Sequence, residues 1–119
     1  MFPSQIDKLL TKLTELSSKD KVEWKETGTA TTYLASVDKF VVTINKSGSE
    51  VFGGFSLQIL DLKGRVVEGV TAPFVGREKS PEDYGSWERL RDLYEIARRR
   101  ALHSEKVVSG LLASLDRIA

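Results

Sequence analysis

Four short segments rich in β-branched and aromatic residues follow one another through the middle of the chain. Within them apolar and polar residues alternate, which is the pattern of a strand with one buried and one solvated face. The connections between the segments are too short for a crossover helix, so neighbouring segments are expected to pair antiparallel. The predicted strands are residues 30–37, 39–46, 55–62 and 65–71.

The alternation also assigns faces to the predicted strands. A further apolar-polar-apolar step, Val22-Glu23-Trp24, suggests a short edge strand with Trp24 turned onto the core. The sequence Asp61-Leu62-Lys63-Gly64 is typical of a tight turn, because the acidic residue opens it and the glycine can adopt positive φ. Residues 45–54 are expected to form a longer hairpin loop. Six side chains of the second and third long strands are expected to face the core: Phe40, Val42, Ile44, Phe55, Leu57 and Ile59.

Helical patterns flank the strands on both sides. Apolar residues at spacings of three and four predict one helix over residues 3–17 and another over residues 86–102. A further apolar stripe runs to the end of the chain, and Ser104 is expected to cap it. We therefore expect the helix to break at His103-Ser104. Residues 72–85 hold two prolines and two glycines and are predicted to be a long loop.

These elements predict a single α+β domain over residues 1–119. It comprises an N-terminal helix, a three- to four-stranded antiparallel meander, and one or two C-terminal helices packed on one face of the sheet. One contact cluster is expected to join the strands and the helix, since each member lies on the apolar face of its own element. Its predicted members are Phe40, Ile44, Phe55, Leu57, Leu90, Leu93 and Tyr94.

The composition excludes several kinds of chemistry. The chain has no cysteine, which excludes a disulfide framework, a thiolate zinc site and a cysteine nucleophile. His103 is its only histidine, and its place at a helix end explains it without catalysis. We expect a non-enzymatic protein without a cofactor or metal. The longest apolar runs are far shorter than a membrane span, and the first residues lack the pattern of a signal peptide, so a cytoplasmic location is expected.

An arginine cluster marks the predicted helix over residues 86–102, although the formal net charge is only +1. Consecutive helical residues point in different directions, so the run cannot form one face. Arg98 is expected to be structural, stacking near Trp87 and Tyr94 and reaching the sheet. Arg99 is expected to form a surface pair with Glu95. The alternative role is nucleic-acid contact through Arg89, Arg98, Arg99 and Arg100.

Apolar residues exceed what one face of a four-stranded sheet readily covers. Two of them lie in the predicted loop and one lies on the face of the arginine-bearing helix opposite to its apolar stripe. The C-terminal stripe adds more. Two interpretations stay open, in which these residues either bind a partner or fold back over the core. The candidate partner-binding residues are Phe74, Tyr84, Ile96, Leu111 and Leu115.

Two short motifs carry a resemblance to known proteins. Thr32-Tyr33-Leu34-Ala35 begins one strand, and Leu90-x-x-Leu93-Tyr94-x-x-Ala97-Arg98-Arg99 lies in the predicted helix. With the helix–meander–helix order, these motifs resemble a group of small uncharacterised bacterial α+β proteins over roughly residues 24–102. The resemblance implies a bacterial origin and carries no activity or site.

Three functions fit these observations. The first is a non-enzymatic protein-protein interaction or assembly module, with self-association as a homodimer expected. The second is a nucleic-acid-binding accessory protein that uses the arginine-rich helix. The third is a small-ligand pocket between sheet and helix, lined by Trp24, Tyr33, Trp87 and Tyr94.

Overall fold

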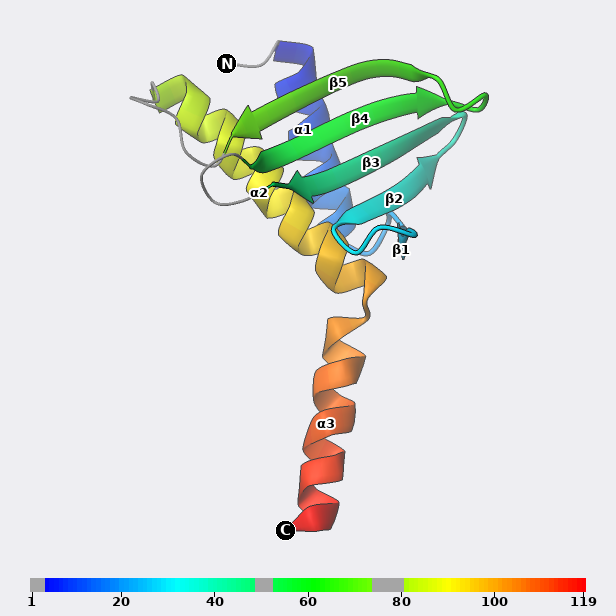
Figure 1. Ribbon diagram of the computed structural model, residues 1–119, viewed down its shortest axis with the longest axis vertical. Coiled ribbons are helices and arrows are strands. Elements are labelled where there is room, and N and C mark those ends of the chain that lie inside the picture. The colour runs from blue at the N-terminus through cyan, green and yellow to red at the C-terminus, as the bar shows by residue number, and fades with distance from the viewer. Residues whose placement is uncertain (1–3, 49–52, 74–80) are drawn as a thin grey trace.

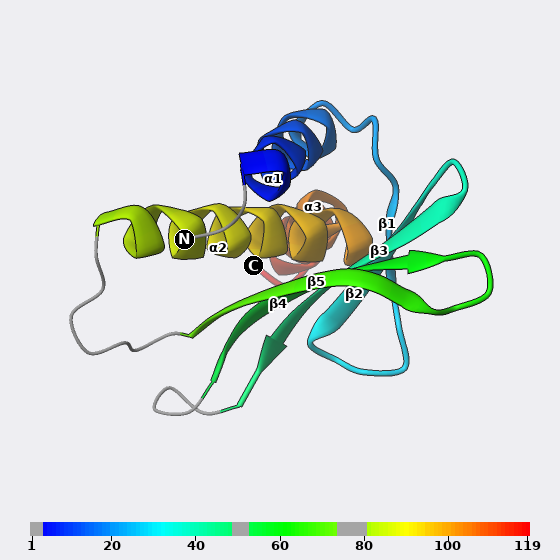
Figure 2. The same ribbon diagram turned by 90° about the horizontal axis from the view of Figure 1, so that it is seen from above.

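The computed structural model describes residues 4–48, 53–73 and 81–119, with the side chains of residues 73 and 81–84 outside the description. It shows an α+β fold in which a sheet, a long helix and the N-terminal helix lie in successive layers, and a last helix projects away from them (Figures 1 and 2). The predicted fold class is therefore confirmed in its main elements.

The sheet is an antiparallel meander in which each strand pairs with its neighbour in sequence. It has five strands, so the predicted count of three to four is wrong. The extra strand is the short edge strand, shifted two residues from the Val22-Glu23-Trp24 step, because Trp24 pairs with Ala35. The strands are β1 (Trp24–Glu26), β2 (Thr32–Val37), β3 (Phe40–Ser47), β4 (Gly54–Asp61) and β5 (Val66–Pro73).

The turn between β4 and β5 forms as its sequence predicts. One carboxylate oxygen of Asp61 accepts hydrogen bonds from the backbone N–H groups of Lys63 and Arg65, at 2.9 and 3.1 Å. The second oxygen accepts from the Arg65 guanidinium at 2.8 Å. Gly64 has a φ of 78°, which glycine adopts without steric cost. These bonds lower the pKa of Asp61 below its ordinary value of 3.8, chiefly through the Arg65 N–H.

One face of the sheet carries the core. Leu57 lies opposite Ile44 in the register, and both are buried together with Leu90, Leu93 and Tyr94 of the long helix. The predicted cluster is confirmed for these residues and for Phe55.

Phe40 is the exception, because it is 49% exposed and the prediction that it belongs to the core is wrong. It begins β3 at the hairpin with β2, and this end of the sheet extends past the long helix (Figure 2). Ile59, which was also expected in the core, is only half-buried.

The long helix α2 (Pro81–Ala101) crosses the sheet and separates it from α1 (Ser4–Ser18). α2 begins five residues before the predicted start, because Pro81 suits a first helical turn rather than a loop. Two arginines of α2 join it to α1. Arg89 lies 3.3 Å from the Asp7 carboxylate, and Arg100 donates a 2.8 Å hydrogen bond to the carbonyl of Ser18.

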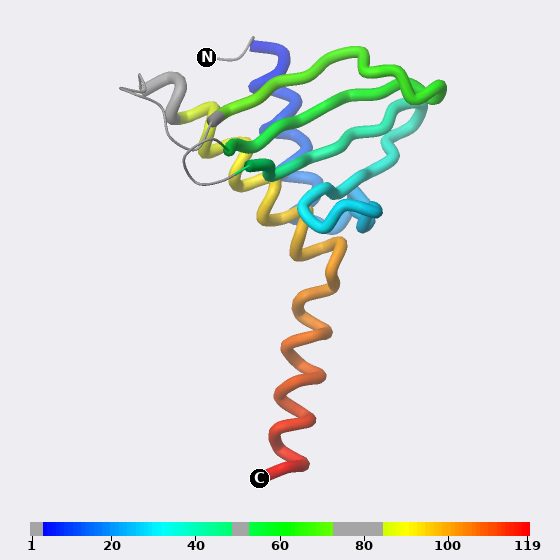
Figure 3. Tube along the Cα trace, viewed as in Figure 1, coloured from blue at the N-terminus to red at the C-terminus, as the bar shows by residue number. Residues whose placement is uncertain are grey.

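The last helix, α3 (Ser104–Ile118), leaves the domain at an elbow (Figures 1 and 3). Among the described elements α3 touches only α2, so the prediction that a second C-terminal helix packs on the sheet is wrong. The predicted break is confirmed. Within the described ranges, no helix is both long enough and apolar enough to cross a membrane.

Candidate interaction surface

The apolar face of α3 is the most unusual surface of the protein. None of the helix residues is buried, although the amphipathic pattern is that of a helix with a covered face. At about 100° per residue, the large apolar side chains occupy an arc of about 140°. Their exposed fractions run from 51% for Leu115 to 81% for Ile118. We call this set the α3 face: Val107, Val108, Leu111, Leu112, Leu115 and Ile118.

The elbow holds the α3 face away from the domain. His103 adopts the left-handed conformation, with φ 52° and ψ 48°, and occupies the position before the first turn of α3. Its N–H bonds to the carbonyl of Arg100, and its own carbonyl accepts from Val107. Ser104, expected as the cap, is the first residue of α3 instead. His103 therefore lies at a helix end as predicted, and the conformation that breaks the helix is its own.

The charged residues of α3 form two groups on different sides of the helix. At about 100° per residue, Glu105 and Asp116 lie about 20° apart, next to Leu112 at one border of the α3 face. Lys106 and Arg117 also lie about 20° apart, on the back of the helix. The helix thus has an acidic edge and a basic back, with no net charge.

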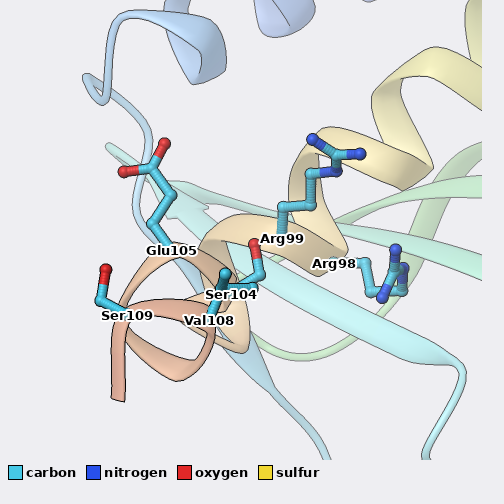
Figure 4. Close-up of a pocket in the computed structure, with 6 residues that line it drawn as sticks. All are labelled: Arg98, Arg99, Ser104, Glu105, Val108 and Ser109. Atoms are coloured by element: carbon cyan, nitrogen blue, oxygen red, sulfur yellow. The ribbon is translucent and has the colours of Figure 1, made fainter. Parts of the chain in front are cut away.

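An open hollow of about 550 Å³ lies inside the elbow (Figure 4). Arg98 and Arg99 of α2 line one side of it, and α3 supplies the other side. Arg98 donates a 3.2 Å hydrogen bond to Glu95. Arg99 has no hydrogen bond or ion pair with any residue in the described ranges. The lining residues contributed by α3 are Ser104, Glu105, Val108 and Ser109.

Two predicted arginine contacts are wrong. Glu95 pairs with Arg98 three residues on rather than with Arg99 four residues on. The guanidinium that stacks on Trp87 belongs to Arg91, whose Cζ lies 4.9 Å from the ring centroid. Among the described residues Arg98 has no hydrogen bond to the sheet and no stacking contact with Trp87, and its side chain is 39% exposed. Its charge does act on the neighbouring Tyr94, where it opposes the rise of the hydroxyl pKa that burial causes.

The candidate nucleic-acid residues do not form one basic surface. Arg89 and Arg100 face α1, as does the half-buried Ile96 on the same stripe of α2. Arg98 is paired on the side of the elbow. Of the four candidate arginines, Arg99 alone has no hydrogen bond or ion pair with a residue in the described part of the chain. Ile96 is half-buried on this stripe, and its role as partner-binding surface stays a prediction.

The aromatic side chains that were candidates for a ligand pocket lie in or against the core. The rings of Tyr33 and Tyr94 are 5.7 Å apart, and Phe55 lies 5.4 Å from Tyr94. Trp24 is buried, and Trp87 packs against the same cluster. Burial raises the pKa of the Tyr94 hydroxyl above 10.0. The aromatic side chains therefore pack into the core between the sheet and α2, which is where the ligand pocket was predicted.

The remaining partner-binding candidates divide. Leu111 and Leu115 belong to the α3 face. Phe74 and the side chain of Tyr84 lie outside the described residues. Sequence reasoning missed a second exposed apolar group at the hairpin ends of the sheet, where consecutive valines in β5 could have indicated that one must face solvent. These exposed side chains are Val37, Phe40, Leu62, Val66 and Val67, and they lie on both faces of the sheet, since Val66 and Val67 are consecutive in β5.

Comparison with protein-family models, curated proteins and solved structures finds no match to this chain. Among the residues that the structure describes, no three metal-ligating side chains lie together.

Proposed function

We propose that this protein is a cytoplasmic, non-enzymatic assembly module that self-associates through the α3 face. The observation that carries the proposal is a 15-residue amphipathic helix with no buried residue, held away from its own core. In water such a face is stabilised when it is covered. The cytoplasmic location is supported only by a cysteine-free sequence, which is compatible with a reducing compartment.

The size of the α3 face fits a second copy of the same helix. Six branched side chains on each copy would bury on the order of 1,000 Å² in total when two helices pair. That area is about the smallest found in specific interfaces. The elbow offers additional surface beside α3, so the pair can exceed this minimum.

The charges favour protein over an anionic surface as the occupant. α3 carries two acidic and two basic residues, whereas helices that bind anionic lipid are rich in basic residues. The nucleic-acid alternative needs a continuous basic stripe, and Arg89, Arg98 and Arg100 are engaged within the chain. Self-association needs neither feature.

Sedimentation of the full chain over a range of concentrations tests the proposal. The parental chain is expected to form a dimer, and Leu111→Glu should leave a monomer because it places a charge at the centre of the covered face. Ala113→Glu is the matched control, since Ala113 is exposed on the side of α3 opposite to the α3 face. A parental chain that stays monomeric at every concentration overturns the proposal.

A further inference from the structure

We infer that two copies of α3 pair antiparallel, with Arg99 of each copy facing Asp116 of the other. This inference rests on the proposed function and specifies the geometry of the same surface. It is carried by the shape of the molecule, by the spacing of the α3 face and by the charges around the elbow.

The shape of the molecule selects the direction of the pair. α3 descends beneath the middle of the domain in both views (Figures 1 and 2). Across the two shorter axes the protein measures 37 and 25 Å, whereas packed helices lie about 10 Å apart. Parallel helices at that distance would force the two domains into the same space. Antiparallel helices place the domains at opposite ends.

The spacing of the α3 face selects the register. Leu111 lies at the middle of α3, with apolar side chains on both sides of it. A two-fold axis at Leu111 places Val107 of one copy opposite Leu115 of the other. At each end of the pair, Ser104 of one copy lies at the same height along the helix as Ile118 of the other. This register covers the α3 face along its whole length, so the self-complementary contact that a two-fold dimer requires is met.

The charges then give Arg99 its partner. In an antiparallel two-fold pair, each edge of a helix meets the same edge of the other copy, so Glu105 meets Asp116 of the second copy. Two facing carboxylates repel each other unless a cation lies beside them. Arg99 lines the elbow hollow together with Glu105 (Figure 4). Asp116 of the second copy would approach this hollow because it meets Glu105. Glu95 accepts a hydrogen bond from Arg98 and not from Arg99, so the Arg99 guanidinium is available to a carboxylate of the second copy.

A charge exchange tests this pairing. R99E is expected to weaken dimerisation about tenfold or more, because it places like charges face to face. D116R is expected to weaken dimerisation by less, because it places like charges against Arg99 but also removes the repulsion between Glu105 and Asp116. A mixture of the two variants should form a heterodimer of near-parental affinity, since both of its contacts join opposite charges. R117E is the matched control, because Arg117 lies on the back of α3 and its change should leave dimerisation intact.

Single cysteines provide an independent measurement, since the chain contains none of its own. In the antiparallel register two copies of Leu111 meet on the axis, whereas two copies of Ser104 lie about 20 Å apart. Leu111→Cys should therefore form a disulfide-linked dimer under a mild oxidant. Ser104→Cys should do so only when mixed with Ile118→Cys. A parallel pair would link Ser104→Cys to itself.

The outcomes separate the inference from the proposed function. If Leu111→Glu abolishes the dimer but the R99E and D116R mixture does not recover, or Ser104→Cys links to itself, self-association stands and the antiparallel pairing is overturned. If Leu111→Glu leaves the dimer unchanged, α3 is not the interface and both proposals fail. Recovery of the mixture together with cross-linking at Leu111→Cys supports both.

Discussion

The indole Nε1 of Trp24 donates a 2.8 Å hydrogen bond to the hydroxyl of Ser17, and both side chains are buried. Trp24 begins the edge strand β1, and Ser17 lies in the last turn of α1. The bond therefore ties the N-terminal helix, which otherwise packs on α2, to the edge of the sheet. A buried indole N–H needs such a partner because water cannot replace it.

Removal of this hydroxyl is expected to destabilise the fold. Ser17→Ala leaves the Trp24 N–H buried without its acceptor, which should lower the free energy of unfolding by about 1–3 kcal/mol. Ser18→Ala is the matched control, because the Ser18 hydroxyl is exposed and bonds only within its own helix. Urea denaturation of the two variants measures the difference. Equal midpoints would mean that the bond contributes nothing to stability.

The core makes a second comparison possible. Leu57→Ala should lower the free energy of unfolding by about 2–5 kcal/mol, because Leu57 is 1% exposed and its loss leaves a cavity. Phe40→Ala should cost about 1 kcal/mol or less, since half of its surface already meets water. Thermal melts of the two variants are sufficient to rank their losses of stability. A larger loss at Phe40 would indicate that this end of β3 is covered.

Leu57 and Phe40 also show how far the sequence predicts this fold. Alternation places both on the same sheet face, and that assignment is correct. Which part of that face is covered depends on where α2 crosses the strands. The position of that crossing is not encoded in any local sequence pattern. The Asp61 turn was predictable because its hydrogen bonds lie within five residues. Trp24–Ser17 was not, because it joins elements through tertiary packing.

The surface was less predictable than the fold for the same reason. The apolar stripe of α3 is visible in the sequence, but its exposure depends on the conformation of His103. Arg89 and Arg100 have partners set by the position of α1, which the spacing of residues in α2 does not reveal. Glu95 has an arginine both three and four residues on, and spacing alone assigned it to Arg99 instead of Arg98.

Arg100 should contribute most to stability among the three consecutive arginines. It donates to the carbonyl of Ser18 at the end of α1, a group that has no partner within its own helix, and it lies 3.9 Å from Asp20. Arg100→Ala is expected to lower the free energy of unfolding by about 0.5–1.5 kcal/mol. Arg98→Ala and Arg99→Ala should each stay within about 0.5 kcal/mol. Chemical denaturation that ranks Arg98→Ala above Arg100→Ala would contradict this assignment.

Asp61 should make the fold sensitive to acid. Its pKa is lowered in the folded chain, so its ionised form favours folding at pH values above 3.8, and this contribution is lost as the pH falls through the folded-state pKa. The stability advantage of the parent over Asp61→Asn should therefore shrink below pH 3.8. An NMR titration should place the Asp61 carboxyl below 3.8 in the folded chain and near its ordinary value in urea. A folded-state pKa above 3.8 would contradict the turn geometry.

The conformation of His103 gives the sharpest test of the elbow. A left-handed conformation costs a non-glycine residue about 1–2 kcal/mol, whereas glycine adopts it freely. His103→Gly should therefore stabilise the chain by up to about 1 kcal/mol. His103→Ala should leave stability unchanged or lower it, because alanine lacks this freedom. A continuous helix would reverse the order, since alanine is the best helix former and glycine among the worst. Melts in which alanine stabilises and glycine destabilises would show that α2 and α3 form one straight helix.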